Sequence, residues 1–308
     1  METKFKIGPV VIALLTTQSS FTRIPPSRYD LFEYTGEEPP TLTLRVHEES
    51  AFQARPKRLI AELENNWRLY ELQDRNFYEL EILEQTAFQV KAVARINKAW
   101  DEIDFYKVPL TQLSEDLKPH WNTGAVFEPL VQWWLTAWAA MNKKGLLIHG
   151  CAVAWQGQGL AFIGASGAGK STIGGIFLKE TDAELLNDER IFVWRDERNW
   201  YVSGTPWPGM LDKASPGTAP LARIFSLKKG PTNQIKSLSP LSLTTDLFPQ
   251  FFLPIWNLKK MEGITILADS LFEEVPCAEL EFLKDASVVN YLGEVLQISP
   301  RCVATESK

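Results

Sequence analysis

Apolar and polar side chains alternate along several short segments in the first third of the chain, a period of two that is typical of half-buried β-strands. The clearest example is 41–46, TLTLRV. Residues 4–15 predict a first strand, interrupted by Gly8-Pro9, and 55–65 predict a short helix. Further segments rich in aromatic and β-branched residues predict strands at 67–72, 77–83, 88–96 and 103–106. These patterns predict a β-rich N-terminal domain over residues 1–112.

A polar, proline-containing stretch at 113–124 predicts a linker, and a different period follows it. Apolar residues then recur at i, i+3, i+4 and i+7, which places them on one face of a helix. These residues are Phe127, Leu130, Val131, Trp134, Leu135, Trp138 and Met141. Lys143, Lys144 and Gly145 suit the end of that helix. Because the tryptophans follow the helical spacing, we interpret them as core residues.

Short apolar runs and one helix-compatible segment alternate in the second half of the chain. Strands are predicted at 146–149, 151–155, 160–163 and 183–187, with a helix at 170–179. Residues 191–194 and 200–202 predict a β-hairpin, which introduces antiparallel pairing into the sheet. We therefore predict a second domain over 125–308 of the α/β class (α+β mixed), with a mixed sheet.

The motif G-x-x-x-x-G-K-[ST] stands between the predicted strand at 160–163 and the predicted helix at 170–179. Its residues are Gly164, Ala165, Ser166, Gly167, Ala168, Gly169, Lys170 and Ser171, followed by Thr172. The glycines let backbone amides turn toward phosphate oxygens, and the helix directs its positive dipole end at the same place. Lys170 can reach the β- and γ-phosphates, and the Ser171 hydroxyl can bind Mg²⁺. The motif predicts binding of ATP with Mg²⁺.

Two acidic residues, Asp188 and Glu189, follow the strand predicted at 183–187. Carboxylates at a strand end beside a phosphate loop suit a metal ligand or the group that activates an attacking hydroxyl. The alternative is a solvated turn, since Asp-Glu-Arg is a common surface tripeptide. With the phosphate loop only one helix away, the functional interpretation is favoured.

The composition of the chain opposes a nucleic-acid-binding protein and a membrane-spanning protein. The net charge of −6 opposes a nucleic-acid-binding function, which usually needs a basic face. No apolar run approaches the roughly 20 residues that a membrane-spanning helix needs. Three cysteines without a CxxC pair suit a reducing compartment, so we expect a cytoplasmic protein.

At this point the chain resembles the HPr kinase/phosphorylase superfamily, whose core is similar to that of ATP-dependent phosphoenolpyruvate carboxykinase. The resemblance covers about residues 126–300, and it implies that the domain over 125–308 is catalytic and has a phosphate-loop kinase core. It is carried by Ile148-His149-Gly150, by 164–172, by Leu186-Asn187-Asp188-Glu189-Arg190, and by Gly204-Thr205-Pro206-Trp207-Pro208-Gly209. The last segment is similar to an HPr-kinase-related group that includes kinases of a lasso-peptide serine. The family usually has Asp-Asp where this chain has Asp188-Glu189.

The resemblance implies a role for each matching residue. Lys170 and Ser171 match the ligands of the nucleotide and of Mg²⁺, and Asp188 matches the acid that takes the proton from a substrate serine. His149 matches a histidine near the phosphates, although a core histidine at a strand end is the simpler alternative without the family. Ser171, Asp188 and Glu189 are the candidate metal ligands.

These expectations combine into a kinase that transfers the γ-phosphoryl group of ATP to a serine-type hydroxyl of a protein or peptide. The alternatives are a small-molecule kinase on the same site, or a nucleotide-binding regulatory module without transfer. We expect no nucleic-acid or membrane partner, and a homo-oligomer is compatible with the sequence. Two interpretations of Trp207 remain open. It contacts an adenine ring or an acceptor side chain at the site, or it fills the core of the domain.

Overall fold

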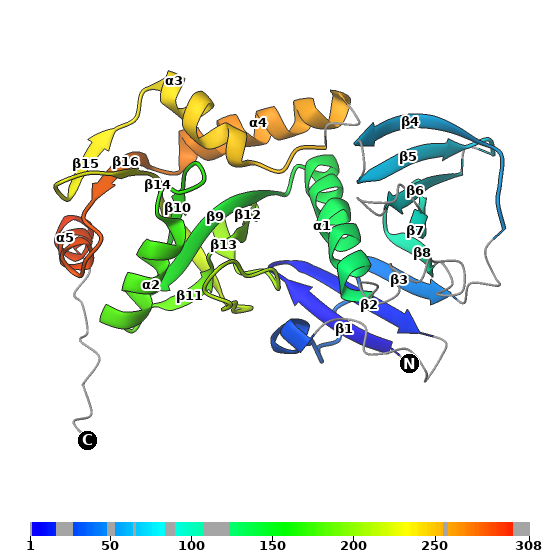
Figure 1. The fold of residues 1–308 in the computed structure, drawn as a ribbon, viewed down its shortest axis with the longest axis horizontal. Coiled ribbons are helices and arrows are strands. Elements are labelled where there is room, and N and C mark those ends of the chain that lie inside the picture. Colours follow the sequence, from blue (N-terminus) through cyan, green and yellow to red (C-terminus); the bar gives the residue numbers. More distant parts are fainter. Residues whose placement is uncertain are drawn as a thin grey trace, which may run out of the picture. The chain divides into compact units, whose positions relative to one another are not determined.

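The computed structural model describes residues 2–16, 27–47, 53–63, 66–74, 76–83, 90–107, 123–254 and 258–297. The chain divides into two compact units (Figure 1). Unit 1 comprises Met1–Trp138 and Pro254–Leu258, and unit 2 comprises Ala139–Leu253 and Lys259–Lys308. Among the described residues, no helix is both long and apolar enough to cross a membrane.

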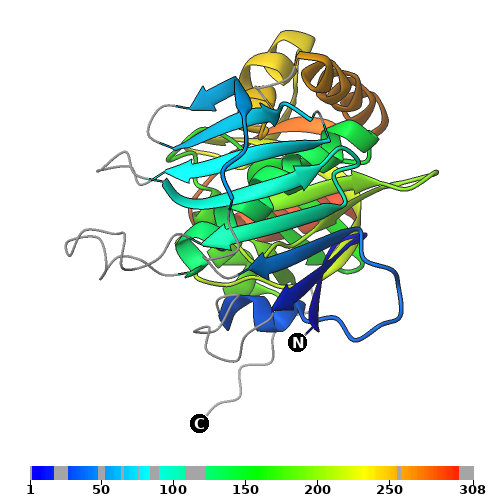
Figure 2. The same cartoon turned by 90° about the vertical axis from the view of Figure 1, so that its right-hand side faces the viewer.

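Unit 1 is built on an eight-stranded sheet in the order β1-β2-β3-β8-β7-β6-β5-β4 (Figure 2). The strands are β1 (Glu2–Ile7), β2 (Val10–Thr16), β3 (Leu42–His47), β4 (Lys57–Leu63), β5 (Trp67–Leu72), β6 (Phe77–Leu83), β7 (Val90–Asn97) and β8 (Glu102–Lys107), and a 3₁₀ turn, η1 (Ser27–Phe32), follows β2. The pairs β2–β3 and β3–β8 are parallel, and the other neighbours are antiparallel. Leu42, Leu44 and Val46 are buried in alternation, as the period of two predicts.

The helix predicted from the i, i+3, i+4 spacing is α1 (Thr123–Asn142). Its residues Phe127, Leu130, Val131, Trp134 and Leu135 are buried. The Trp134 indole N–H donates to the Trp100 carbonyl at 2.8 Å. The core interpretation of this tryptophan is therefore confirmed.

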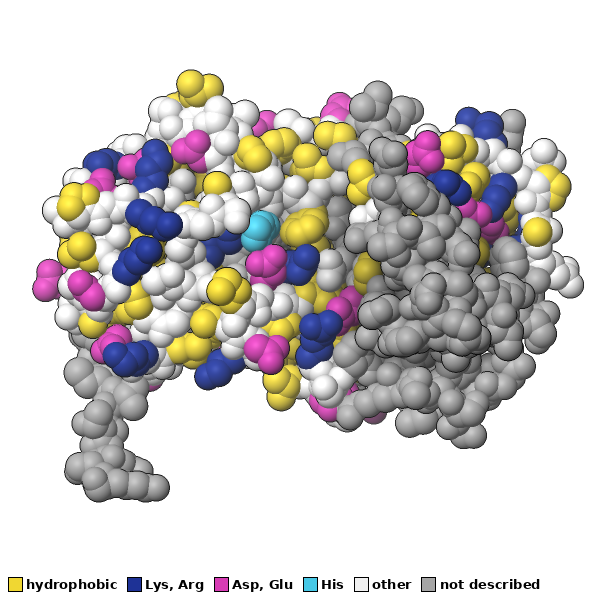
Figure 3. Space-filling model, in the orientation of Figure 1, with side chains coloured by type: hydrophobic (Ala, Val, Ile, Leu, Met, Phe, Trp, Pro, Cys, Tyr) yellow, Lys and Arg dark blue, Asp and Glu magenta, His cyan; other side chains and the backbone are white. Residues whose placement is uncertain are grey.

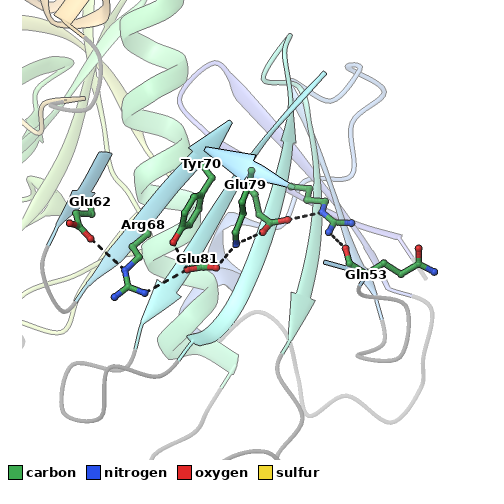
Figure 4. Close-up of polar contacts among 8 residues, drawn as sticks. Gln53, Glu62, Arg68, Tyr70, Glu79 and Glu81 are labelled. Carbon is green, nitrogen blue, oxygen red and sulfur yellow. Dashed lines mark hydrogen bonds and ion pairs between the residues drawn. The ribbon is translucent and has the colours of Figure 1, made fainter. Parts of the chain in front are cut away.

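Charged side chains form a network across β4 to β7 of unit 1 (Figure 4). Glu79 is 1% exposed and accepts from Lys57 at 2.8 Å and from Arg95 at 3.0 Å. Tyr70 donates to Glu81 at 3.1 Å. Buried charges persist only when they are paired, so these contacts compensate one another across neighbouring strands.

Unit 2 holds the second eight-stranded sheet, in the order β10-β9-β12-β13-β14-β16-β15, with β11 paired to β9. Its strands are β9 (Gly145–Trp155), β10 (Gln158–Ile163), β11 (Glu184–Asn187), β12 (Arg190–Arg195), β13 (Trp200–Ser203), β14 (Thr218–Lys229), β15 (Gln234–Ser237) and β16 (Cys277–Phe282). Its helices are α2 (Lys170–Glu180), α3 (Pro240–Ser242), α4 (Leu258–Glu274) and α5 (Ser287–Leu296), with the short helical turns η5 (Leu243–Leu247) and η6 (Phe248–Gln250) between α3 and α4. A further pairing of β14 with β10 closes the ring β10-β9-β12-β13-β14 into a five-stranded barrel.

Two hydrophobic clusters stabilise unit 2. One includes Ile264, Leu267 and Leu271 of α4 together with barrel residues such as Ile148 and Ile191. The other joins α2 and α5 to the sheet, and its members include Ile173, Phe177, Phe225, Val288 and Leu292. Helix α2 is thereby anchored on its apolar side while its first turn stays at the surface cavity described below.

The predicted α/β class with a phosphate-loop kinase core is wrong. Strands make up 43% of the structure and helices 28%, and a kinase core of that class is not shown. The hairpins β9–β10 and β12–β13 are antiparallel, and they place the phosphate loop on a barrel. The prediction failed because a strand–loop–helix unit fixes only its local geometry, whereas the class depends on pairings distant in sequence.

The element predictions have mixed outcomes. The helix predicted at 55–65 is wrong, since Lys57–Leu63 forms β4 and pairs with β5. Sheet pairing overrides the weak helix preference of this segment. The strand predicted at 4–15 is a hairpin of β1 and β2, because Gly8-Pro9 forms the turn. The predicted linker lies outside the described residues, except Thr123 and Gly124, which begin α1.

Candidate phosphate-binding site

The predicted phosphate loop connects β10 to α2, as the sequence motif requires. Gly167 has φ 78° and Gly169 has φ 111°, backbone conformations that side chains other than hydrogen disfavour. Gly169 is the N-cap of α2, and no side chain caps the helix there. The first amides of a helix lack intrahelical partners, so the loop and the start of α2 form a ready anion site.

The two glycines differ in the space around them, which gives a matched pair of variants. A methyl group at Gly169 would lie 2.8 Å from the Phe282 ring, whereas one at Gly167 would meet nothing within 4 Å. We expect Gly167→Ala to cost roughly 1–2 kcal/mol of unfolding free energy from backbone strain. Gly169→Ala should cost a further 1–3 kcal/mol or so from overpacking. Urea unfolding of both variants tests this, and equal losses would contradict the observed packing.

Lys170 lies at the base of the loop and is 7% exposed. Its ammonium donates to the Gly164 carbonyl at 2.8 Å and to the Ala165 carbonyl at 3.4 Å. Burial lowers the pKa of Lys170, and Glu189 partly offsets that effect. The side chain is thus held inside the loop by backbone carbonyls, from which it can turn toward a phosphate.

A cavity of about 340 Å³ opens over the loop. It is lined by His149, Ser166, Gly167, Gly169, Lys170, Ser171, Thr172, Glu189, Met210, Lys229 and Lys284. The structure therefore brings His149 and Glu189 together with most of the loop. Figure 3 shows a histidine on this face of unit 2 with acidic and basic side chains beside it.

His149 and Glu189 form a pair within the cavity lining. The Nε2 atom of His149 lies 3.3 Å from Oε2 of Glu189, and both side chains are about one-third exposed, at 32% and 34%. Burial, and then the charge of Lys170, lower the pKa of His149 more than Glu189 raises it. The lowered pKa favours the neutral imidazole, which is the form that can accept a proton.

Asp188 has a different place from its neighbour Glu189. Its carboxylate is fully buried, does not line the cavity, and accepts from the backbone amides of Gly209 at 2.8 Å and Leu211 at 3.1 Å. The segment 209–211 therefore covers the acid predicted as the base. In this arrangement Asp188 fixes the loop, and Glu189 is the carboxylate that faces the cavity.

Asn187 holds the backbone around Asp188 and Glu189 in place through hydrogen bonds. This fully buried amide donates to the Thr205 carbonyl at 2.8 Å, and its Oδ1 accepts from the amides of Glu189 and Arg190 at 2.7 and 2.8 Å. Thr205 in turn donates to the Arg190 carbonyl at 2.6 Å. The end of β11 is thus tied to the start of the 204–217 loop, which places Glu189 at the cavity.

The sequence did not identify three of the residues that line the cavity: Lys229, Lys284 and Met210. Lys229 is the last residue of β14, and Lys284 follows β16 by two positions. The available signal was a lysine at the end of a strand or just beyond it, and this signal becomes informative only when the strand order is known. Met210 is 91% exposed on the loop that covers Asp188.

No family model and no curated protein matches this chain. The resemblance to the HPr kinase/phosphorylase superfamily is therefore carried by the local motifs alone.

Proposed function

We propose that this protein is an ATP- and Mg²⁺-dependent phosphotransferase that passes the γ-phosphoryl group to a serine-type hydroxyl of a protein or peptide. The observation that supports it is the cavity in which the phosphate loop, Lys170, Ser171 and the His149–Glu189 pair lie together. An anion site, a cation for the phosphates and a proton acceptor are the parts that phosphoryl transfer needs. ATP-dependent chemistry of this kind agrees with the cytoplasmic location expected from the sequence.

The residues present fit a magnesium ion. Among the described residues, no three His, Cys, Asp or Glu side chains gather into a metal cluster. Magnesium rarely uses such a cluster, since it keeps several waters and binds through one or two protein groups plus substrate phosphates. Ser171 and Glu189 both line the cavity and would hold the ion, whereas Asp188 is buried and does not line the cavity. When bound, the ion neutralises charge on the phosphates.

Other residues of the cavity would bind the phosphates and accept the proton of the attacking hydroxyl. The loop amides and Lys170 would hold the phosphates in the cavity that His149 also lines. Neutral His149, held by Glu189, accepts the proton of the attacking hydroxyl. This assignment differs from the role that the resemblance implies for Asp188, because Glu189 and His149 line the cavity whereas Asp188 is buried and does not.

A nucleotide-binding regulatory module is the second candidate. It is favoured by one observation, the two backbone hydrogen bonds that occupy Asp188. A module of this kind would bind Mg-ATP without producing ADP.

Calorimetric titration with Mg-ATP, followed by measurement of ADP formation, tests the proposal. We expect wild-type protein to bind Mg-ATP and slowly transfer to water, and Lys170→Ala to lose both activities by at least about ten-fold, since it removes a charged contact to phosphate. Lys179→Ala is the matched control, because Lys179 lies on the same helix with its side chain 82% exposed. Binding without any ADP would support the regulatory module, and absence of binding would reject both candidates.

A further inference from the structure

Two lysines outside the phosphate-loop motif lie at the ends of strands that flank the loop. Strands β10, β14 and β16 are parallel neighbours, so their carboxyl ends meet at the same edge of the sheet. The loop follows β10, Lys229 ends β14, and Lys284 lies just beyond β16. Both lysines line the same cavity as the loop.

The first and last glycines of the motif contact the strands that carry these lysines. A methyl group at Gly164 would lie 3.4 Å from the Leu227 carbonyl, and one at Gly169 would lie 2.8 Å from the Phe282 ring. Leu227 and Phe282 stand two positions before Lys229 and Lys284, respectively. Leu227 and Lys229 share a face of β14, whereas Lys284 lies just beyond the end of β16. The loop therefore rests on the ends of the two strands that lead to these lysines.

Within the described part of the chain, the charges of the two lysines have no partner. Neither forms an ion pair with any residue that the structure describes, whereas nearby Lys228 and Lys236 pair with Glu279 at 2.6 Å and Glu281 at 2.8 Å. The cavity's one lining carboxylate, Glu189, lies against His149. Because the whole chain carries a net charge of −6, this local positive excess is not a consequence of composition.

A single phosphate does not account for this excess. The loop amides, the start of α2 and Lys170 already form a site for the β-phosphate region of a nucleotide. Lys229 and Lys284 supply two more positive charges from the ends of β14 and β16, which continue the sheet beside β10. Lys229 and Lys284 are exposed side chains that line the cavity beside the loop, and cations that line a cavity raise the local concentration of anions there.

We infer that Lys229 and Lys284 form a second anion position in this cavity, which takes a phosphate or carboxylate group next to the one held by the loop. This inference rests on the proposed function and deepens it. The group has two possible sources with the same chemistry: the γ-phosphoryl group of the donor, or an anionic group of the acceptor close to its hydroxyl. In either case the two lysines contact a reactant and the loop alone does not define the substrates.

The test uses the full chain and the double variant Lys229→Met/Lys284→Met, with Lys228→Met/Lys236→Met as the matched control. Each protein is titrated with Mg-ADP, with Mg-ATP, and with inorganic phosphate after saturation by either nucleotide. Mg-ADP should bind the wild type and both variants within about three-fold. The control should resemble the wild type in every titration.

The results separate the two sources. If the position holds the γ-phosphoryl group, the double variant has an affinity for Mg-ATP that is roughly ten-fold lower or more. Phosphate then binds the Mg-ADP complex of the wild type but not that of the double variant. If it holds an acceptor anion, both nucleotides bind the double variant normally. Phosphate then binds the Mg-ATP complex of the wild type but not that of the double variant. A double variant that binds both nucleotides and phosphate like the wild type overturns the inference. A wild type that binds no nucleotide instead overturns the proposed function, and the two failures are therefore distinguishable.

Discussion

Replacing Trp207 by alanine is expected to lower the free energy of unfolding by about 3–5 kcal/mol, with little change in the affinity for Mg-ATP. Trp207 is 2% exposed and does not line the cavity, so the structure favours the core alternative over a contact with adenine. It lies between two anchored points, Thr205, which accepts from Asn187, and Gly209, which donates to Asp188. Removing the indole leaves a void beneath this segment.

Urea unfolding and Mg-ATP titration of the same samples measure the two effects of Trp207→Ala. Met210→Ala is the matched control, since Met210 is 91% exposed on the same loop and its loss should change stability by no more than about 0.5 kcal/mol. Trp207→Phe, which keeps part of the ring volume, provides an intermediate case if the alanine variant does not fold. Unchanged stability together with weaker nucleotide binding would restore the site interpretation of Trp207.

The conformation of the loop at 164–171 was predictable because it is encoded within a few consecutive residues. The glycines at 167 and 169 adopt positive φ, and α2 begins at Lys170, as the motif predicts. The period of α1 was readable for the same reason, since its buried face repeats along one helix. Local patterns of this kind depend on neighbours in sequence, which a single chain displays directly.

The fold class and two cavity lysines were not predictable in this way. The barrel closes through the pairing of β10 with β14, which are about 60 residues apart in the sequence. No local sequence pattern predicts that pairing. Lys229 and Lys284 reach the cavity only because β14 and β16 continue the sheet beside β10. The burial of Asp188 likewise depends on the amides of Gly209 and Leu211.

The Asp188→Asn variant has the second large expected effect. It distinguishes a catalytic base from a carboxylate that only holds the 209–211 segment. A catalytic base would lose roughly 10²–10⁴ in transfer rate on this change while the fold stays intact. The structure instead shows both oxygens accepting backbone amides in a fully buried position. Asparagine keeps one acceptor and turns an NH₂ group toward the other amide, so we expect a loss of about 1–3 kcal/mol of stability.

Glu189→Gln is the natural partner of this variant, because Glu189 is 34% exposed, faces the cavity and lies 3.3 Å from His149. It should reduce the rate of ADP formation while unfolding stays close to that of the wild type. Melting temperature, Mg-ATP affinity and turnover measured on both variants give the answer. If Asp188→Asn is as stable as the wild type but cannot transfer, the base is Asp188, and segment 209–211 must open during the reaction. If it is destabilised while residual folded protein still transfers, Asp188 holds that segment in place, and the proton passes to the His149–Glu189 pair.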